Sequence, residues 1–392
     1  MASSGIGPAM STPALLVSTG TRWPGTARIP WALANAGFEV TLLTPRDTLA
    51  EKSSFLARVG HLPDNPTVRQ WLYSFTATVK ATSPRLVLPC DDMAFRLLQS
   101  VVLSPPQDLR PELQLELAAL IRESLGDPAG YRASVDHTLW PPAAAALGIR
   151  VPPFVIAADV GEAEPLAATH GYPLVVRRHY AFSGQGVAIC SNRDELARAF
   201  AELSRASVFD LDEPGPGRLL VQAQLPGRTR HYAVAAWQGA LLAGWAADTL
   251  VADPEPAGRG TVFRYHRSPE TRGFAEKLVG TFGMTGIFGL EFVADPRTGE
   301  SSLVAINRSI TPGSHRGSWF DVDLCAALHS ALHGLPSPSR ADLGEGEEGV
   351  DVRFPEEWLR DSNSDYLRTY PVDVPWEEPE LIEAMLALRH ER

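Results

Sequence analysis

The feature that most constrains the fold is a pair of short apolar segments joined by a cationic, glycine-bearing connection. Residues 172–178 read Tyr-Pro-Leu-Val-Val-Arg-Arg, and residues 183–189 read Ser-Gly-Gln-Gly-Val-Ala-Ile. The pattern predicts a buried strand that ends in a fixed cation, a flexible turn and a second strand. Small residues let backbone N–H groups approach phosphate oxygens, and an arginine can bind a phosphate through two hydrogen bonds. The alternative is an ordinary tight hairpin turn, which glycine also favours.

A second stretch has an apolar strand followed by a connector. Residues 219–227 read Leu-Leu-Val-Gln-Ala-Gln-Leu-Pro-Gly. Backbone amide and carbonyl groups in such a connector can bind the edge of an adenine while apolar side chains enclose its ring. A strand followed by a simple turn fits these residues equally well.

The third stretch predicts a β-hairpin with a carboxylate on an apolar strand. Residues 286–295 form the first strand, residues 296–299 the turn, and residues 303–308 the second strand. Glu291 and Asn307 both fall among apolar neighbours, where a carboxylate needs a partner. A carboxylate and an amide oxygen close together can hold Mg²⁺, with phosphate oxygens completing its shell. The alternative is a buried Glu291 that is paired with Arg308 or Arg316.

The N-terminal part, to about residue 105, reads as α/β. Predicted strands at residues 14–18, 39–43 and 85–88 alternate with a helix at residues 26–36. Parallel pairing in such a unit places functional loops at the carboxyl ends of the strands, and these loops are residues 18–22 and 89–92. The first has no GxGxxG pattern, so a dinucleotide fingerprint is absent. Asp91 and Asp92 are interpreted as N-caps of the helix that follows, with substrate contact as the alternative.

Composition limits the partners and the compartment. The formal net charge of −11 argues against binding to a nucleic-acid backbone, which needs a basic face. Cys90, Cys190 and Cys325 lie far apart without metal-ligand spacing, as expected in a reducing compartment. The first apolar stretch, residues 14–17, is too short for a signal peptide or a membrane span. We therefore expect a cytoplasmic protein that binds neither nucleic acid nor membrane.

The order of these motifs resembles the ATP-grasp superfamily over about residues 14–334, and most closely its carbamoyl-phosphate-synthetase-like and carboxylate–amine ligase branches. The resemblance implies an α/β ATP-grasp fold with an α+β lid. It divides the chain into a Rossmann-like pre-ATP-grasp domain (residues 1–105), an ATP-grasp domain (residues 106–334) and a linker with a C-terminal appendage (residues 335–392). Within the ATP-grasp domain it implies a lid at about residues 135–218 and a C-terminal half at about residues 219–334. The aromatic residues of the appendage are expected to pack on the main body.

The same resemblance implies an ATP-dependent ligase that activates a small carboxylate as an acyl phosphate for attack by an amine, with ATP and Mg²⁺ as cofactors. It places Arg177 and Arg308 on the phosphates as catalytic residues and Glu291 and Asn307 on the metal. It implies that ATP is bound by His137, Arg177, Ser183, Gly184, Gln185, Gly186, Gln222, Ala223, Gln224 and Leu225. It implies that the substrate is bound by His231, Ser314, His315 and Arg316. An acidic ATP-grasp chain with such an appendage is also compatible with a homodimer.

Several positions depart from the family pattern. His137 stands where a lysine or arginine is usual, and Ala223 replaces the usual hinge glutamate. The acid that binds ribose aligns with Arg230. Ala305 occupies the place of a metal-bridging glutamate, and the arginine expected two residues after Asn307 is Ser309. These losses keep two alternatives open: a degenerate ATP-grasp protein that binds a nucleotide or another anion without ligation, and a scaffold that acts through protein contacts.

Overall fold

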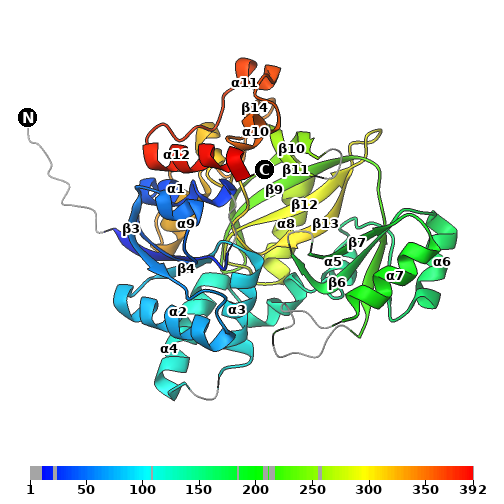
Figure 1. Cartoon of the computed structure of the whole chain (residues 1–392), viewed down its shortest axis with the longest axis horizontal. Coiled ribbons are helices and arrows are strands. Elements are labelled where there is room, and N and C mark those ends of the chain that lie inside the picture. Colours follow the sequence, from blue (N-terminus) through cyan, green and yellow to red (C-terminus); the bar gives the residue numbers. More distant parts are fainter. Residues whose placement is uncertain are drawn as a thin grey trace, which may run out of the picture.

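The computed structural model describes residues 11–20, 24–106, 109–182, 185–205, 211, 217–254 and 258–391. It contains three sheets (Figure 1). Within these ranges no helix is both long and apolar enough to cross a membrane.

The N-terminal part is a parallel four-stranded sheet in the order β3-β2-β1-β4. Its strands are β1 (Thr12–Val17), β2 (Phe38–Thr44), β3 (Leu56–His61) and β4 (Leu86–Pro89), and its helices are α1 (Ile29–Asn35), α2 (Val68–Thr82), α3 (Asp92–Leu103) and α4 (Pro111–Leu125). The three predicted strands and the first helix are present, whereas β3 was not predicted. Its side chains are mostly half-buried or exposed, so it lacks a strong apolar signal.

The second sheet is antiparallel, in the order β5-β8-β6-β7. Its strands are β5 (Phe154–Ala157), β6 (Leu174–Phe182), β7 (Gln185–Cys190) and β8 (Leu219–Ala223), and it is preceded by α5 (Trp140–Ala146). The apolar faces of α6 (Val160–His170) and α7 (Arg193–Leu203) pack on it and form a separate small core. The predicted strand–turn–strand motif is thus the pair β6 and β7.

The third sheet has six antiparallel strands in the order β13-β12-β9-β10-β11-β14. They are β9 (Arg228–Trp237), β10 (Ala240–Asp253), β11 (Arg259–His266), β12 (Gly286–Ala294), β13 (Ser301–Asn307) and β14 (Glu348–Val352). One face packs on α8 (Pro269–Thr281), and the other packs on α9 (Leu324–Leu332) and the N-terminal sheet. Because side chains alternate along a strand, each strand divides its residues between these two faces.

The C-terminal part is joined to this sheet rather than set apart from it. Strand β14 pairs with β11 from Val262 opposite Val352 to His266 opposite Glu348. The helices α10 (Glu356–Arg360), α11 (Asp365–Thr369) and α12 (Pro379–Ala387) follow, and Leu381 and Met385 of α12 are fully buried. Residues that follow the predicted linker therefore complete the largest sheet of the molecule.

Candidate active site

A cavity of about 730 Å³ lies where the three sheets meet. This volume is in the range of sites that bind cofactors and small molecules. The lid contributes His137, Arg177, Ala181 and Val187; the six-stranded sheet contributes Thr229, His231, Thr249, Phe263 and Glu291; and the N-terminal part contributes Cys90, Asp91 and Asp92.

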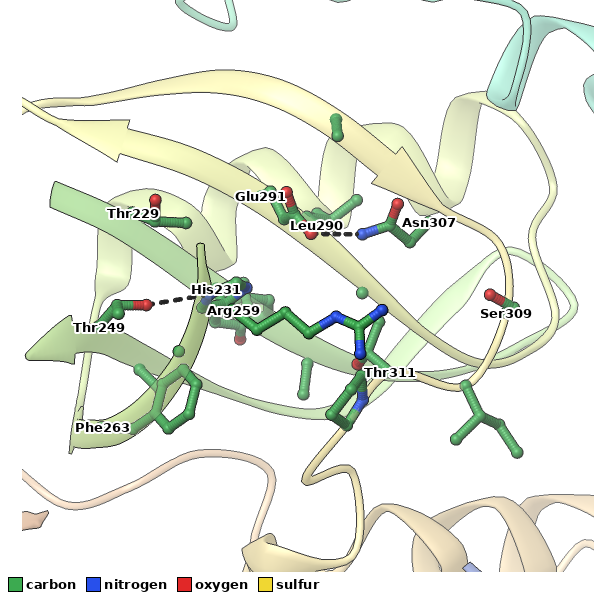
Figure 2. Close-up of a pocket in the computed structure, with 18 of the residues that line it drawn as sticks. Thr229, His231, Thr249, Arg259, Phe263, Leu290, Glu291, Asn307, Ser309 and Thr311 are labelled. Carbon is green, nitrogen blue, oxygen red and sulfur yellow. Dashed lines mark hydrogen bonds between the residues drawn. The ribbon is translucent and has the colours of Figure 1, made fainter. Parts of the chain in front are cut away.

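Glu291 and Asn307, the two predicted metal ligands, lie together on the cavity side of the hairpin. The amide Nδ2 of Asn307 donates a hydrogen bond to Oε1 of Glu291 at 2.8 Å (Figure 2). The antiparallel register sets Gly289 opposite Asn307 and Glu291 opposite Ala305, so all four positions lie on one face. The alternative in which Glu291 pairs with Arg308 or Arg316 is wrong, because both guanidinium groups are bound elsewhere.

Arg177 supplies a positive charge to the cavity from β6. Its side chain forms no hydrogen bond or ion pair with a residue that the structure describes. Burial lowers the pKa of Arg177, and the negative charge of Glu291 opposes that change. A buried guanidinium without a partner is costly, so this group is suited to receive an anion.

His137 lies beside Arg177 but brings no charge. Its Nδ1 is 3.1 Å from the carbonyl oxygen of His179. Burial lowers the pKa of His137 to about 3, and the charge of Arg177 lowers it further. The ring is therefore neutral at physiological pH and cannot replace the lysine or arginine that is usual at this position.

Arg308 does not line the cavity, which corrects its assignment to the phosphates. Its guanidinium donates to the Oγ of Ser134 and to the carbonyl oxygen of Leu125, both at 2.8 Å. It also lies 4.8 Å from the ring of Phe95 and 5.2 Å from that of Phe288. Burial lowers its pKa to about 10. Arg308 thus ties the hairpin to α3, α4 and the turn at Ser134, and we assign it a structural role.

The three residues expected to hold substrate after β13 are also turned away from the cavity. The hydroxyl of Ser314 donates to the carbonyl oxygen of Thr311 at 2.7 Å. His315 bonds to Asp373 at 2.7 Å, and burial lowers its pKa to about 4. Arg316 is 1% exposed and forms ion pairs with Asp351 and with Asp373. The residues that do line the cavity after β13 come earlier in the loop: Ser309, Ile310, Thr311 and Pro312.

The predicted adenine connector lies at the end of β8, outside the residues that line the cavity. The backbone N–H of Ala223 donates to Pro153, and that of Gln224 donates to Pro173. Gln222 pairs with Val175 of β6 and Phe154 of β5, so it lies inside the lid sheet. Leu225 follows β8. The ATP-binding roles of these four residues stay predictions.

The predicted phosphate-covering turn is described only in part. Ser183 and Gly184 lie outside the described residues, whereas Gln185 and Gly186 begin β7. Gly186 has φ of +77°, and a Cβ there would lie 3.0 Å from Cδ of Arg178. Glycine is therefore required at this position for both its backbone angle and its small size.

Part of the sequence matches a known family model. Residues 136–222 match the family model for the ATP-binding domain of the carbamoyl-phosphate synthase L chain. No curated protein matches the sequence.

Solved structures resemble the chain over most of its length. The biotin carboxylase domain of Hydrogenobacter thermophilus 2-oxoglutarate carboxylase, in complex with MgADP, ADP and bicarbonate, aligns with a TM-score of 0.62 at 16% identity, over 86% of this chain and 73% of that one. Campylobacter jejuni biotin carboxylase aligns with a TM-score of 0.64 at 14% identity, over 88% of this chain and 76% of that one. The chain has the ATP-grasp fold. Staphylococcus aureus N5-carboxyaminoimidazole synthetase aligns with a TM-score of 0.59 at 11% identity, over 87% of this chain and 82% of that one.

In this ATP-grasp chain, Arg230 lies on the sheet face opposite the cavity. Its guanidinium bonds to both carboxylate oxygens of Asp248, at 2.6 and 3.0 Å. The next residue, His231, is the one that lines the cavity, and its Nε2 lies 3.2 Å from the hydroxyl of Thr249. Burial lowers the pKa of His231, and the charge of Glu291 opposes this. The absence of an acid at position 230 therefore removes nothing from the cavity.

Asp92 and Arg259 are among the charged cavity residues that were not identified as site residues from the sequence. Asp91 caps α3 as predicted, accepting from the backbone N–H of Ala94 at 2.8 Å, and both Asp91 and Asp92 line the cavity. Arg259 extends across the cavity from the start of β11 (Figure 2). It lies in a Pro/Gly-rich stretch, residues 253–260, which has no hydrophobic period from which the direction of a side chain can be predicted.

Asp92 has an environment that predicts a measurable dependence of stability on pH. Its carboxylate accepts a hydrogen bond from Ser309 Oγ at 2.9 Å. Burial, together with the charges of Asp91 and Glu291, raises its pKa to about 7. The unfolded chain loses this proton at a pH near the ordinary aspartate pKa of about 3.9, so the group destabilises the fold progressively between about pH 4 and pH 7.

We expect Asp92→Asn to raise the free energy of unfolding at about pH 8 by up to about 4 kcal/mol, and by much less at about pH 5. Urea denaturation at the two pH values measures this. The control is Asp64→Asn, which removes the same charge from an exposed position. It should change the free energy of unfolding equally at the two pH values. A gain that does not depend on pH would contradict the assigned protonation of Asp92.

Proposed function

We propose that this protein is an ATP-dependent ligase that activates a small carboxylate as an acyl phosphate for attack by an amine. The observation that carries the proposal is the convergence of Arg177, Glu291 and Asn307 on one cavity. A cation without a described partner faces a carboxylate–amide pair across a space of nucleotide size. The match of residues 136–222 to an ATP-binding domain supports the same assignment.

Glu291 and Asn307 fit a magnesium site. Their oxygens lie on one strand pair, and Mg²⁺ is commonly bound by one or two protein oxygens, phosphates and water. When bound, the metal neutralises phosphate charge. Among the described residues there is no group of three histidine, cysteine or acidic side chains that could hold a metal by itself. In this proposal, phosphate oxygens of ATP and water molecules complete the shell.

Arg177 is proposed to bind the transferring phosphoryl group. Transition states of phosphoryl transfer carry charge on the equatorial oxygens, which a positioned guanidinium stabilises. His231 and Thr249 lie on the same wall and offer polar atoms to a sugar or substrate. The Hydrogenobacter thermophilus structure is a complex with MgADP and ADP, and the Campylobacter jejuni structure is a complex with beta-gamma-ATP, which supports a nucleotide as the ligand here.

One observation favours the second candidate, a nucleotide-binding protein without ligase activity. Ala305 lies directly opposite Glu291, so the hairpin has a single carboxylate where the family pattern has two. Because His137 is neutral, Arg177 is the one cation among the described lid residues that line the cavity. The absence of a carboxylate at position 305 disfavours catalysis through two metal ions.

The biotin carboxylase domain from Hydrogenobacter thermophilus is described as a dimer, and we propose a homodimer for this chain as well. The cytoplasmic location remains a proposal from the sequence.

Calorimetry with ATP and Mg²⁺, followed by a screen for ADP release over pairs of carboxylates and amines, tests the function. We expect binding that requires Mg²⁺, and ADP release for at least one pair. Glu291→Ala should abolish the effect of Mg²⁺ on affinity, because the only carboxylate of the hairpin at this position is removed. Glu300→Ala, in the exposed turn of the same hairpin, is the control.

Absence of ATP binding at millimolar concentration would overturn the ligase and would restrict the second candidate to binding of another anion. Binding without ADP release for any pair would favour the second. Unchanged affinity of Glu291→Ala would mean that the hairpin is structural.

A further inference from the structure

The cavity has a second charged end that the nucleotide roles do not use. Away from Arg177 and the metal pair, its wall is formed by β10, β11 and the C-terminal segment. The residues there are Trp245, Phe263, Asp253, Arg259, Arg353 and Glu356. Two of them, Arg353 and Glu356, come from beyond the region in which the sequence resembles a known family.

Strand β14 is what brings the C-terminal segment to this wall. Asp351 pairs with Phe263 across the two strands, and Glu356 follows five residues later at the start of α10. Figure 1 shows β14 and α10 beside β10 and β11. The position of Glu356 is therefore fixed by sheet pairing and not by a free tail.

The charge of Arg353 is already neutralised. Its guanidinium is 3.3 Å from Asp351, 3.3 Å from the hydroxyl of Tyr265 and 3.3 Å from the carbonyl oxygen of Pro312. It also lies 4.7 Å from the centre of the Phe263 ring. These contacts hold it in place, so it is not available for a close ion pair.

Glu356 is not neutralised in the same way. Its carboxylate forms no ion pair at contact distance with a residue in the described part of the chain. Burial raises its pKa, and the charges of Arg353 and Arg259, together with a hydrogen bond from its own backbone N–H, oppose this. A buried carboxylate without a close ion pair is suited to bind a ligand of the opposite charge.

We propose that Glu356 and the ring of Phe263 form the subsite for the attacking nucleophile, which enters as a primary ammonium ion with an apolar body. Glu356 binds the ammonium group, and the ring of Phe263, which lines the same end of the cavity, contacts the apolar part. This inference rests on the proposed function, since it assigns one end of the same cavity to the amine. It makes the C-terminal segment the determinant of amine specificity.

The test uses the full chain with saturating MgADP and two matched probes, benzylamine and benzyl alcohol, at neutral pH. Calorimetry should show that benzylamine binds at least about tenfold more tightly, as expected for one charge-assisted hydrogen bond. Glu356→Gln should reduce that preference to about twofold or less. Glu348→Gln, an exposed residue of β14, removes the same charge and should leave the preference unchanged.

Equal binding of the two probes to the wild-type protein would overturn the subsite, as would a preference for benzylamine that survives in Glu356→Gln. Binding of MgADP, measured in the same preparation, separates this outcome from failure of the proposed function. If MgADP binds and the amine is not preferred, only the subsite is wrong. If MgADP does not bind, the nucleotide assignment is wrong, and the probes are then compared on the nucleotide-free protein with the same criteria.

Discussion

Arg177→Met is expected to weaken binding of MgATP at least about 100-fold, since a charge-assisted bidentate contact to phosphate contributes about 3 kcal/mol or more. Arg177 carries a guanidinium into the cavity that has no partner among the described residues. Methionine keeps most of the length and the apolar stem of the side chain, so the decrease in affinity for MgATP measures the contribution of the charged group. Calorimetry with MgATP measures it.

Arg177→Lys is the matched variant. It retains the charge and should recover most of the affinity, while losing the second hydrogen bond of the guanidinium. Arg193→Met, on the exposed surface of the lid, is the control and should bind MgATP normally. If Arg177→Met bound MgATP as tightly as the wild-type protein, the phosphates would have to lie elsewhere.

Arg316→Met is expected to lower the free energy of unfolding by about 3–5 kcal/mol, the cost of removing one partner from a buried ion pair. Arg316 bonds to Asp351 through Nε at 3.0 Å and to Asp373 through Nη1 at 2.9 Å. Both carboxylates are also buried, at 1% and 5% exposure. Without the guanidinium, Asp351 keeps Arg353 and Asp373 keeps His315, which is neutral above about pH 4.

Urea denaturation at neutral pH measures this loss. Arg340→Met is the control. Arg340 forms an exposed ion pair with Glu347, so this substitution should lower the free energy of unfolding by less than about 1 kcal/mol. A normally stable Arg316→Met protein with weakened substrate binding would contradict the structural role and restore Arg316 as a carboxylate anchor.

The Arg316 network also explains why the C-terminal segment belongs to the main body. Arg316 follows β13, whereas Asp351 and Asp373 lie 35 and 57 residues further along the chain. Arg28 of the N-terminal part also reaches Glu377 and Glu378 of the same segment. The segment is thereby bound to two parts of the fold, which holds Glu356 at the cavity wall.

The sequence alone predicted the features that depend on neighbouring residues. The period-2 pattern of β12 and β13, with Glu291 and Asn307 among apolar residues, was enough to place both on one hairpin. The strand, cation and glycine order predicted β6 and β7, with Arg177 on β6. The buried strands of the N-terminal sheet were predicted for the same reason, because local apolar runs determine which segments form strands.

Only the tertiary structure decided which charged groups share the cavity. Arg308 bonds to residues 174 and 183 positions earlier, and Asp92 receives its hydrogen bond from Ser309, 217 positions later. No local pattern contains such a partner. Arg230 and His231 differ by one position, yet the alternation of the strand places them on opposite faces. A buried charge is stabilised by whichever group the fold brings to it, so its role depends on contacts between distant segments.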